Sequence, residues 1–392
     1  MKFINYTNHT INKSDFKYLS YALKQEKLTT GNFVKKFEHK LSQFCKAKYA
    51  LTTNSATSSL LLSFMSVGAV EDDIIIMPVV NFIAAVNMAK FLKLKIYFSD
   101  VDPDTGQSTP ELVEQCIKKN GLKNIKIILT MYLGGHAYNV IDFYKLKKKY
   151  KCYLIEDACH ALGSKYFLNN KKSYLIGSCS HSDISTFSFH PAKTITTGEG
   201  GLITTNNLKI FNRAKLLRSH GLVRPLNKPK NKIYNHWEYE NSTLGFNFRL
   251  SDLNCALGIS QLKNIKKNIN KKIKLANAYI SYLKNLDFIK IPIIKNEKQL
   301  SSVHLLNVIF KKIHTFSEKE AFLKYMLKNY VICQVHYTPI WNFKAFKKIN
   351  SKNFPNSKLY YIKSVSLPLY SELKLIDVKK ICTLIVKYHG SK

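Results

Sequence analysis

One lysine in the chain lies in a setting that is typical of a reactive amine. Lys193 follows an apolar stretch, residues 184–189, that predicts a short strand ending in a turn. Three glycines lie within residues 198–201, and a second expected strand covers residues 202–205. Small residues let the backbone approach a ligand closely, and an amine held on such a turn suits Schiff-base chemistry. Most of the 57 lysines should be solvated surface groups, so it is the neighbourhood that distinguishes Lys193.

An acidic residue follows another buried-looking strand. Residues 152–156 predict this strand, and Asp157 stands at its carboxyl end, where parallel sheets carry their active sites. Taken alone, Asp157 could equally be a helix N-cap. Paired with Lys193, it fits the acid that keeps the ring nitrogen of pyridoxal phosphate (PLP) protonated. His160 could meet the ring hydroxyl, although a lone histidine is more often a satisfied core residue.

Hydroxyl-bearing residues cluster after the first expected strand of the sheet. Thr57 and Ser58 open a helical pattern soon after the strand at residues 49–52. A helix N-terminus offers N–H groups to an anion, and nearby hydroxyls add donors, so these residues are candidate phosphate ligands. The Gly-Lys pair of a P-loop is missing, which argues against an ATP site, and Ser/Thr caps are common in any case. Ser188, five residues before Lys193, is a further candidate.

An aromatic residue stands where it could cover a planar cofactor. Phe82 follows the expected strand at residues 74–77, and its ring could stack on a cofactor ring. Plain core packing is the alternative for Phe82 alone. Two further polar segments, residues 245–252 and 334–339, stand out beside expected elements, but each taken alone is no more than a polar turn.

Length and composition indicate a globular protein of one or two domains. The chain has 392 residues, of which 45% are hydrophobic. It contains no apolar run long enough for a membrane helix, and its first residues lack the apolar core of a signal peptide. The eight cysteines are scattered without a CxxC pair, which favours reduced thiols in a cytoplasm over a zinc site or a disulfide scaffold. We therefore expect a cytoplasmic protein with no metal site.

The net charge of +36 raises the question of nucleic-acid binding. Only four residues are arginine, the side chain that forks onto bases and phosphates, and the lysines are spread from end to end. This distribution indicates a compositional drift toward lysine, so we do not expect nucleic acid as the partner. The charge could still draw an anionic substrate toward a cleft.

The order of expected elements predicts an α/β fold with a large, mostly parallel sheet. Helical patterns fill the gaps between strands at residues 55–67, 82–92, 110–118 and 140–149, and two more precede the first strand, one opened by Ser14 and one over 33–44. The expected strands of the sheet are residues 49–52, 74–77, 95–98, 125–131, 152–156, 184–189 and 202–205.

The C-terminal part predicts a smaller α+β unit. Ser251 caps one helical pattern, and a lysine-rich helix begins near residue 263. A strand at 303–310, a helix at 319–328 and a strand at 331–335 follow. Before this part, residues 224–241 are rich in Pro, Lys and Asn and predict a long loop, a feature that is often functional in compact domains.

Read together, these segments resemble the DegT/DnrJ/StrS group of sugar-nucleotide aminotransferases, which are PLP enzymes of fold type I. Within the group, the details of residues 54–58, 160–164, 187–190, 218–222 and 334–339 look most like the C4 aminotransferases of pseudaminic acid biosynthesis. The matching segments occur in the family's order and span nearly the whole chain: residues 28–31 with 37–38, 54–57, 156–163, 188–193, 197–201, 218–221, 245–249, 334–337 and 366–368.

The resemblance implies a fold, a cofactor and a reaction. It implies a large PLP-binding domain with an N-terminal arm, residues 1–250, and a small C-terminal domain, residues 251–392. It implies that PLP alternates with pyridoxamine phosphate while the amine of L-glutamate passes to C4 of a UDP-4-keto-6-deoxy-N-acetylhexosamine. It also implies a homodimer with its active sites at the interface.

Individual roles follow from the same resemblance. Lys193 and Asp157 are the expected catalytic residues, the first bonded to the cofactor and the second paired with its ring nitrogen. The remaining expected cofactor ligands are Phe82 and His160 at the ring, Thr57, Ser58 and Ser188 at the phosphate, and Asn247 from the partner subunit. The residues that match positions lining the sugar-nucleotide site are Tyr6, Lys27, Leu28, Thr29, His336 and Tyr337.

Two segments depart from the family pattern, and three alternatives stay open. Residues 134–139 differ from the usual Gly-x-Pro/x-Ala-Asp pattern, which leaves the shape of that loop open, and residues 224–241 are longer and more basic than expected at the substrate mouth. Related PLP-dependent sugar dehydratases carry His in place of Lys193, so the lysine favours transamination. An aminotransferase acting at C3, or on a dTDP- or GDP-sugar, remains possible, as does a non-enzymatic basic regulator or nucleic-acid binder.

Overall fold

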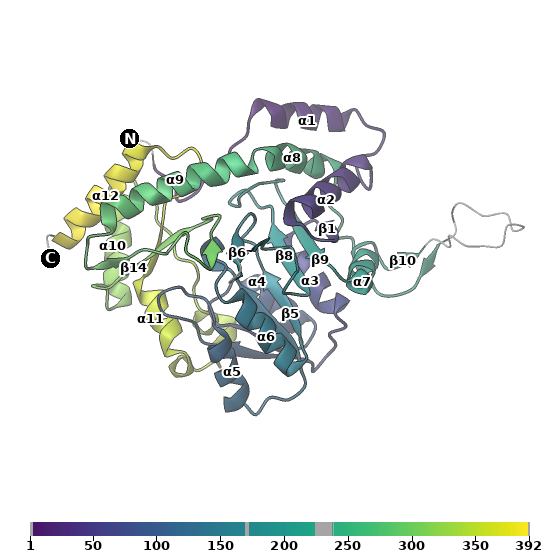
Figure 1. The fold of residues 1–392 in the computed structure, drawn as a ribbon, viewed down its shortest axis with the longest axis horizontal. Coiled ribbons are helices and arrows are strands. Elements are labelled where there is room, and N and C mark those ends of the chain that lie inside the picture. Colours follow the sequence, from purple (N-terminus) through teal and green to yellow (C-terminus); the bar gives the residue numbers. More distant parts are fainter. Residues whose placement is uncertain (1–2, 169–171, 224–236, 238, 391–392) are drawn as a thin grey trace, which may run out of the picture.

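The computed structural model describes residues 3–168, 172–223, 237 and 239–390. At its centre, the described chain forms a seven-stranded sheet in the order β1-β9-β8-β5-β4-β2-β3 (Figure 1). All neighbours pair in parallel except at β9, which runs antiparallel to β1 and β8. The predicted α/β fold with a mostly parallel sheet is therefore confirmed. The strands are β1 (Tyr49–Thr53), β2 (Ile74–Pro78), β3 (Lys95–Ser99), β4 (Ile125–Met131), β5 (Tyr153–Asp157), β8 (Ile184–Ser188) and β9 (Gly201–Thr205).

Helices cover both faces of this sheet, because its strands are apolar on both sides. One face packs against α3 (Ala56–Ser66), α4 (Ile83–Phe91) and α7 (Leu208–Arg218). The other packs against α5 (Pro110–Lys119) and α6 (Val140–Tyr150), and against α2 (Asn32–Cys45) nearer β1. In β4, for example, Leu129 faces the first layer and Ile128 the second, as the period of two requires.

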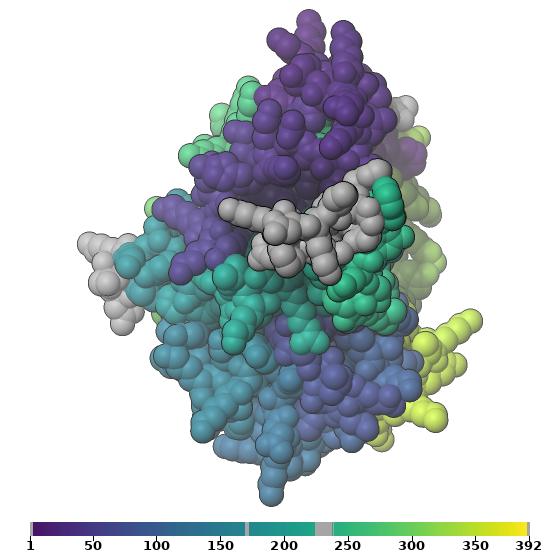
Figure 2. Space-filling model, turned by 90° about the vertical axis from the view of Figure 1, so that its right-hand side faces the viewer, coloured from purple at the N-terminus to yellow at the C-terminus, as the bar shows by residue number. Residues whose placement is uncertain are grey.

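Two N-terminal helices pack on a helix from the second half of the chain. The helices α1 (Lys13–Leu23) and α2 contact α8 (Asp252–Lys263), which continues into α9 (Ile265–Leu283). Ser14 Oγ lies 2.7 Å from Ser260 Oγ, and Gln261 donates to the buried Asp15 carboxylate at 2.8 Å. Figure 2 shows the N-terminal segment forming a cap at one end of the molecule.

The C-terminal part builds a second, smaller core around a three-stranded sheet, β12 (Ile289–Lys290), β14 (Leu306–Phe310) and β15 (Ser364–Leu367). Phe310, Phe322 and Tyr279 are fully buried at its centre. Another sheet, β13 (Gln299–Leu300) with β6 (Lys165–Phe167) and β7 (Ser173–Leu175), joins this part to the large one. The helices that pack around this smaller core are α9, α10 (Phe316–Lys328), α11 (Pro355–Lys363) and α12 (Leu375–Gly390). The boundary between residues 250 and 251 stays a prediction.

In the C-terminal half of the chain, the structure differs from three predictions. The prediction of a strand at residues 331–335 is wrong. Val331 forms an isolated bridge with Ile4, and Gln334 forms another with Ser366. The segment therefore pairs with two different neighbours and runs alongside neither of them. The strand expected at 303–310 begins only at Leu306. The expected loop 224–241 ends in a short strand, β11 (Glu240–Asn241), which pairs with β10 (Leu222–Val223), while residues 224–236 and 238 lie outside the described residues.

No helix within the described residues is long and apolar enough to cross a membrane. The cysteines that the structure describes are all free thiols.

A buried carboxylate holds the N-terminal helices onto α8. Asp252 is fully buried in the first turn of α8 and accepts hydrogen bonds from the backbone N–H groups of Gly31 at 2.7 Å and Phe33 at 2.8 Å. It thereby caps α2, whose own N-cap, Gly31, has no side chain to do so. This contact explains the acidic end of the motif at residues 245–252 as a structural feature.

Replacing Asp252 by alanine should lower the free energy of unfolding by about 2–3 kcal/mol, because buried N–H groups would lose a charged acceptor. Urea denaturation followed by circular dichroism measures this change. Asp252→Asn keeps one acceptor oxygen but turns an NH2 group toward the other backbone N–H, so it should recover only part of this loss. An alanine variant as stable as the parent would show that Asp252 does not hold α2.

Candidate active site

The expected catalytic residues meet in one cavity of about 290 Å³ at the carboxyl edge of the central sheet. Parallel strands end at the same edge, so residues distant in sequence converge there. In register, Asp157 lies beside Met131 and Thr186, and Ser188 lies beside Gly201 on the next strand. The cavity is lined by nine of the predicted residues, namely Tyr6, Thr57, Phe82, Asp157, His160, Ser188, Lys193, His336 and Tyr337.

Lys193 presents an unpaired amine to this cavity. Its backbone N–H closes a turn with the carbonyl of His190 at 2.8 Å, which holds the side chain just beyond the end of β8. Within the described residues, the amine has neither a hydrogen bond nor an ion pair. Desolvation lowers the pKa of the Lys193 amine, and the nearby Cys159 and Asp157 only partly oppose this shift. More of the amine is therefore in the neutral, nucleophilic form near pH 7 than for a surface lysine.

Asp157 is a buried carboxylate with spare hydrogen-bonding capacity. It is 4% exposed, and one oxygen accepts the N–H of Cys159 at 3.2 Å. Burial raises the pKa of the Asp157 carboxyl, while the Cys159 N–H and the charge of Lys193 lower it. A cationic ring nitrogen placed beside it would stabilise its ionised form, since an opposite charge repays desolvation.

The N-terminus of α3 supplies polar groups on the other side of the cavity. The side chain of Thr57 and that of Ser188 both line it. Ser55 caps the helix by accepting the N–H of Ser58 at 3.2 Å. Gly201 allows β9 to approach this turn, because a side-chain carbon there would lie 2.4 Å from the carbonyl oxygen of Ser55. The result is a helix N-terminus with hydroxyls beside it, which is favourable for a phosphate.

Ser58 occupies a different position from the one its sequence context suggests. It is buried and does not line the cavity, and its hydroxyl donates to Asn54 Oδ1 at 2.6 Å. Ser58 therefore supports the turn that carries Thr57.

A group of neutral imidazole and phenol side chains forms one wall of the cavity. His160 is 2% exposed, its Nε2 lies 2.9 Å from Tyr337 Oη, and its ring packs 4.4 Å from that of His304. Burial lowers the pKa of His160 and of His304 well below the ordinary value, and brings that of His336 to about 3. These histidines are uncharged at neutral pH.

The loop that departs from the family pattern supports this wall. Gly134 has φ 71°, a conformation that favours glycine, within a 3-10 turn at Leu133–Gly135. Its backbone N–H donates to His160 Nδ1 at 3.3 Å, and its carbonyl accepts the backbone N–H of His304 at 2.9 Å. The unusual sequence at 134–139 thus forms an ordered support for two cavity histidines.

Phe82 stands at the mouth of the cavity with 52% of its surface exposed. Its ring lies 5.6 Å from that of Tyr337, while Tyr6 lies 5.8 Å from the ring of His336. The exposed face of the Phe82 ring is apolar, and contact with water leaves it unfavourably solvated. A planar group stacked on this face would remove it from water.

Four predicted site residues lie away from this cavity. Asn247 lies in the loop before α8, where it is exposed and forms a β-bridge with Ser219 at the end of α7. Lys27, Leu28 and Thr29 are exposed between α1 and α2, where Thr29 bridges to Ser251. Within one chain, none of them reaches Lys193.

Of the cavity residues that were not predicted, four carry titratable side chains. His190 and Glu199 flank Lys193 within its own motif, and Cys159 follows Asp157, so their proximity in sequence was a usable signal. His304 gave no such signal, because it lies 111 positions from Lys193 and its segment predicted a plain strand. Only the packing of the two parts of the chain brings it to the cavity.

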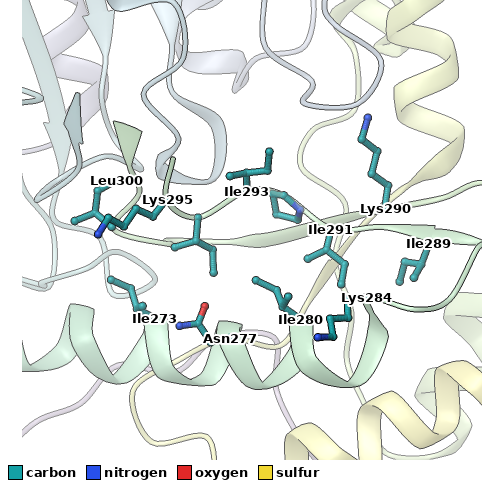
Figure 3. A pocket seen from close by; sticks show the side chains of 12 residues that line it. Ile273, Asn277, Ile280, Lys284, Ile289, Lys290, Ile291, Ile293, Lys295 and Leu300 are labelled. Atoms are coloured by element: carbon teal, nitrogen blue, oxygen red, sulfur yellow. The ribbon is translucent and has the colours of Figure 1, made fainter. Parts of the chain in front are cut away.

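A second cavity, of about 570 Å³, is larger but lacks the groups for this chemistry. Figure 3 shows side chains of α9 facing those of residues 289–295 across it. Isoleucines dominate its walls, together with lysines and Asn277, and none of the described residues that line it is an acid. Its size therefore does not mark it as the reaction site.

The cavity at Lys193 fits the expected cofactor. An unpaired amine, a buried carboxylate, an exposed aromatic ring and a hydroxyl-flanked helix N-terminus correspond to the aldehyde, ring nitrogen, ring face and phosphate of PLP. The group is small and flat, and the cavity lies near the lower end of the usual size range for ligand pockets, about 300 Å³.

Curated transaminases are similar to this chain over nearly its whole length. The chain is 34% identical over 377 residues to the UDP-4-amino-4,6-dideoxy-N-acetyl-beta-L-altrosamine transaminase of Campylobacter jejuni subsp. jejuni serotype O:23/36 (strain 81-176), covering 96% of this chain and 95% of the relative. It is 31% identical over 391 residues to the enzyme of the same name from Helicobacter pylori (strain ATCC 700392 / 26695), covering 99% and 98%.

Solved structures show the same fold. Helicobacter pylori PseC, an aminotransferase involved in the biosynthesis of pseudoaminic acid, superposes with a TM-score of 0.88 at 29% identity over 100% of both chains. The PLP form of Spr1654 from Streptococcus pneumoniae shares the fold at 22% identity and a TM-score of 0.87, covering 98% of this chain and 97% of that one. The model of the DegT/DnrJ/EryC1/StrS aminotransferase family matches residues 9–386. The chain therefore belongs to the DegT/DnrJ/EryC1/StrS aminotransferase family, whose cofactor is pyridoxal phosphate.

Proposed function

We propose that this protein transfers the amine of L-glutamate to C4 of a UDP-4-keto-6-deoxy-N-acetylhexosamine in the cytoplasm, for pseudaminic acid or a related surface glycan. The observation that carries the proposal is the unpaired Lys193 amine in a cavity with Asp157 and the α3 N-terminus. The choice of sugar rests on the relatives at 34% and 31% identity, which are named as altrosamine transaminases.

Each cavity residue then has a chemical role. Lys193 would hold the cofactor, and its Nζ, when free, would move a proton at C4 of the sugar as base and acid. The carboxylate of Asp157 would keep the ring nitrogen protonated. Thr57, Ser188 and the first turn of α3 would hold the phosphate, and Phe82 would cover the ring. When bound, PLP supplies the electron sink and carries the amine between the two substrates.

His160 has less freedom toward the cofactor than the sequence suggests. Both of its ring nitrogens already have protein partners, Gly134 and Tyr337. If His160 contacted the ring hydroxyl of the cofactor, its Nε2 would have to serve both that hydroxyl and Tyr337.

We further propose that the active enzyme is a homodimer. Asn247, Lys27, Leu28 and Thr29 are exposed and do not line the Lys193 cavity of their own chain, which suits a role in the cavity of a partner subunit. Asn247 would then add an amide donor to the phosphate site, and the other three residues would border the substrate.

Lys193→Ala should abolish turnover and the visible absorbance of the lysine-bound cofactor, because no other amine faces the cavity among the described lining residues. Absorption spectroscopy of the PLP-loaded protein and an amine-transfer assay measure both effects. Lys209→Ala, at an exposed lysine of α7, is the matched control and should behave like the parent. Turnover retained by Lys193→Ala would refute the assignment.

The choice of substrate is tested by a panel of nucleotide 4- and 3-ketosugars carrying UDP, dTDP or GDP. The PLP-loaded protein is incubated with L-glutamate and each sugar, and mass spectrometry and NMR identify the product. We expect amination at C4 of the UDP-N-acetyl sugar. Preferential amination of a GDP-sugar would instead place this chain with the GDP-perosamine synthases, one of which, from Escherichia coli O157:H7, is 26% identical. DNA binding without PLP absorbance would support a regulator.

Mixing two inactive variants tests the shared site. Lys193→Ala and Asn247→Ala dimers, mixed and allowed to exchange subunits, should recover up to about a quarter of the parent activity, because half of the dimers become mixed and each of these has one intact site. Each variant mixed with itself is the control. If no activity returns although subunits exchange, Asn247 acts within its own chain.

A further inference from the structure

The hydrogen bonds of His160 determine which of its ring nitrogens carries the proton. The backbone N–H of Gly134 points at His160 Nδ1 from 3.3 Å. A backbone N–H can only donate, so Nδ1 is the acceptor and has no proton. In a neutral imidazole the proton then lies on Nε2.

This tautomer fixes the direction of the next hydrogen bond. His160 Nε2 lies 2.9 Å from Tyr337 Oη, so the Nε2–H donates and the phenol oxygen accepts. The hydroxyl proton of Tyr337 is not used in this contact, and no other hydrogen bond of that hydroxyl occurs within the described residues. Since Tyr337 lines the cavity, its proton is available to a ligand there.

The surroundings keep this arrangement in place. The His160 ring is held by that of His304, and the carbonyl of Gly134 accepts the N–H of His304 at 2.9 Å, which orients the Gly134 peptide. Burial disfavours charge on His160 and on the Tyr337 phenol, so the first stays unprotonated at Nδ1 and the second stays protonated.

We propose that His160 is a positioning residue, which turns the hydroxyl proton of Tyr337 into the cavity so that it can be donated to an oxygen of the acceptor sugar. The inference rests on the proposed function. Beside Asp157 and Lys193, the cavity around Tyr337 offers the uncharged donors and acceptors His304, His336 and Tyr6. Such groups suit the hydroxyl or carbonyl oxygens of a sugar, whereas the carboxylates of glutamate are better held by cations.

Comparing the two half-reactions of Tyr337→Phe tests the contact. Stopped-flow absorbance follows the conversion of the PLP form by L-glutamate, and separately the return of the pyridoxamine form with the ketosugar. We expect the glutamate half-reaction to stay within about twofold of the parent and the sugar half-reaction to slow by about tenfold, the worth of one neutral hydrogen bond. A sugar half-reaction at the parental rate, or equal slowing of both, would overturn the proposal.

Two substitutions of similar size test the role of His160. Glutamine can place an N–H toward Tyr337 and an oxygen toward Gly134, whereas methionine offers neither. His160→Met should slow the sugar half-reaction as much as Tyr337→Phe does, and His160→Gln should restore most of that loss. If the two variants are alike, or if both half-reactions fall together, His160 serves the cofactor or the packing and does not act through Tyr337.

The tautomer can be read without any turnover. In the PLP-loaded protein labelled with ¹⁵N-histidine, the signal that His160→Gln removes should show a protonated Nε2 and an unprotonated Nδ1. A proton on Nδ1 would overturn the proposal even if the enzyme is active. Conversely, a parent enzyme that aminates none of the ketosugars refutes the proposed function, and with it the sugar contact, while the tautomer of His160 is still measured.

Discussion

Holding the Lys193 amine in a partly enclosed cavity, near a buried carboxylate but not paired with it, is the constraint on which this site depends. A direct ion pair with Asp157 would hold the amine charged and occupied. Instead, desolvation outweighs the attraction, and the pKa of the amine falls while that of Asp157 rises. Both groups are thus ready for a ligand that supplies an aldehyde to one and a cationic nitrogen to the other.

The sheet makes this separation possible. Asp157 ends β5, and Lys193 follows β8, the neighbouring strand, so the two side chains approach from adjacent strand ends. The turn between Ser188 and Gly201 carries the lysine outward, and the close approach of β9 to α3 places the helix N-terminus beside it. The rigid sheet therefore fixes the distances between Lys193, Asp157 and the N-terminus of α3.

The cavity wall opposite depends on the smaller part of the chain. His304 and Tyr337 come from segments beyond α9; the Gly134 turn binds both His160 and His304, and Tyr337 meets His160 through its hydroxyl. The family pattern is broken at this turn, yet the left-handed glycine still presents its N–H and its carbonyl in the directions that the histidines need. The same contact ties the two parts of the chain together and orients the polar groups that face the ligand.

The sequence by itself determined the α/β class, the strands of the central sheet to within a residue or two, and the places of Lys193 and Asp157 at strand ends, because strand periodicity and strand-end motifs are local signals. It also placed Thr57, Ser188 and Phe82 at strand ends. The tertiary structure decided that Ser58 supports a turn, that residues 331–335 form no strand, and that His304 joins the cavity. Each of these depends on a partner far away in the chain, and spacing along a sequence carries no information about which distant segments pack together.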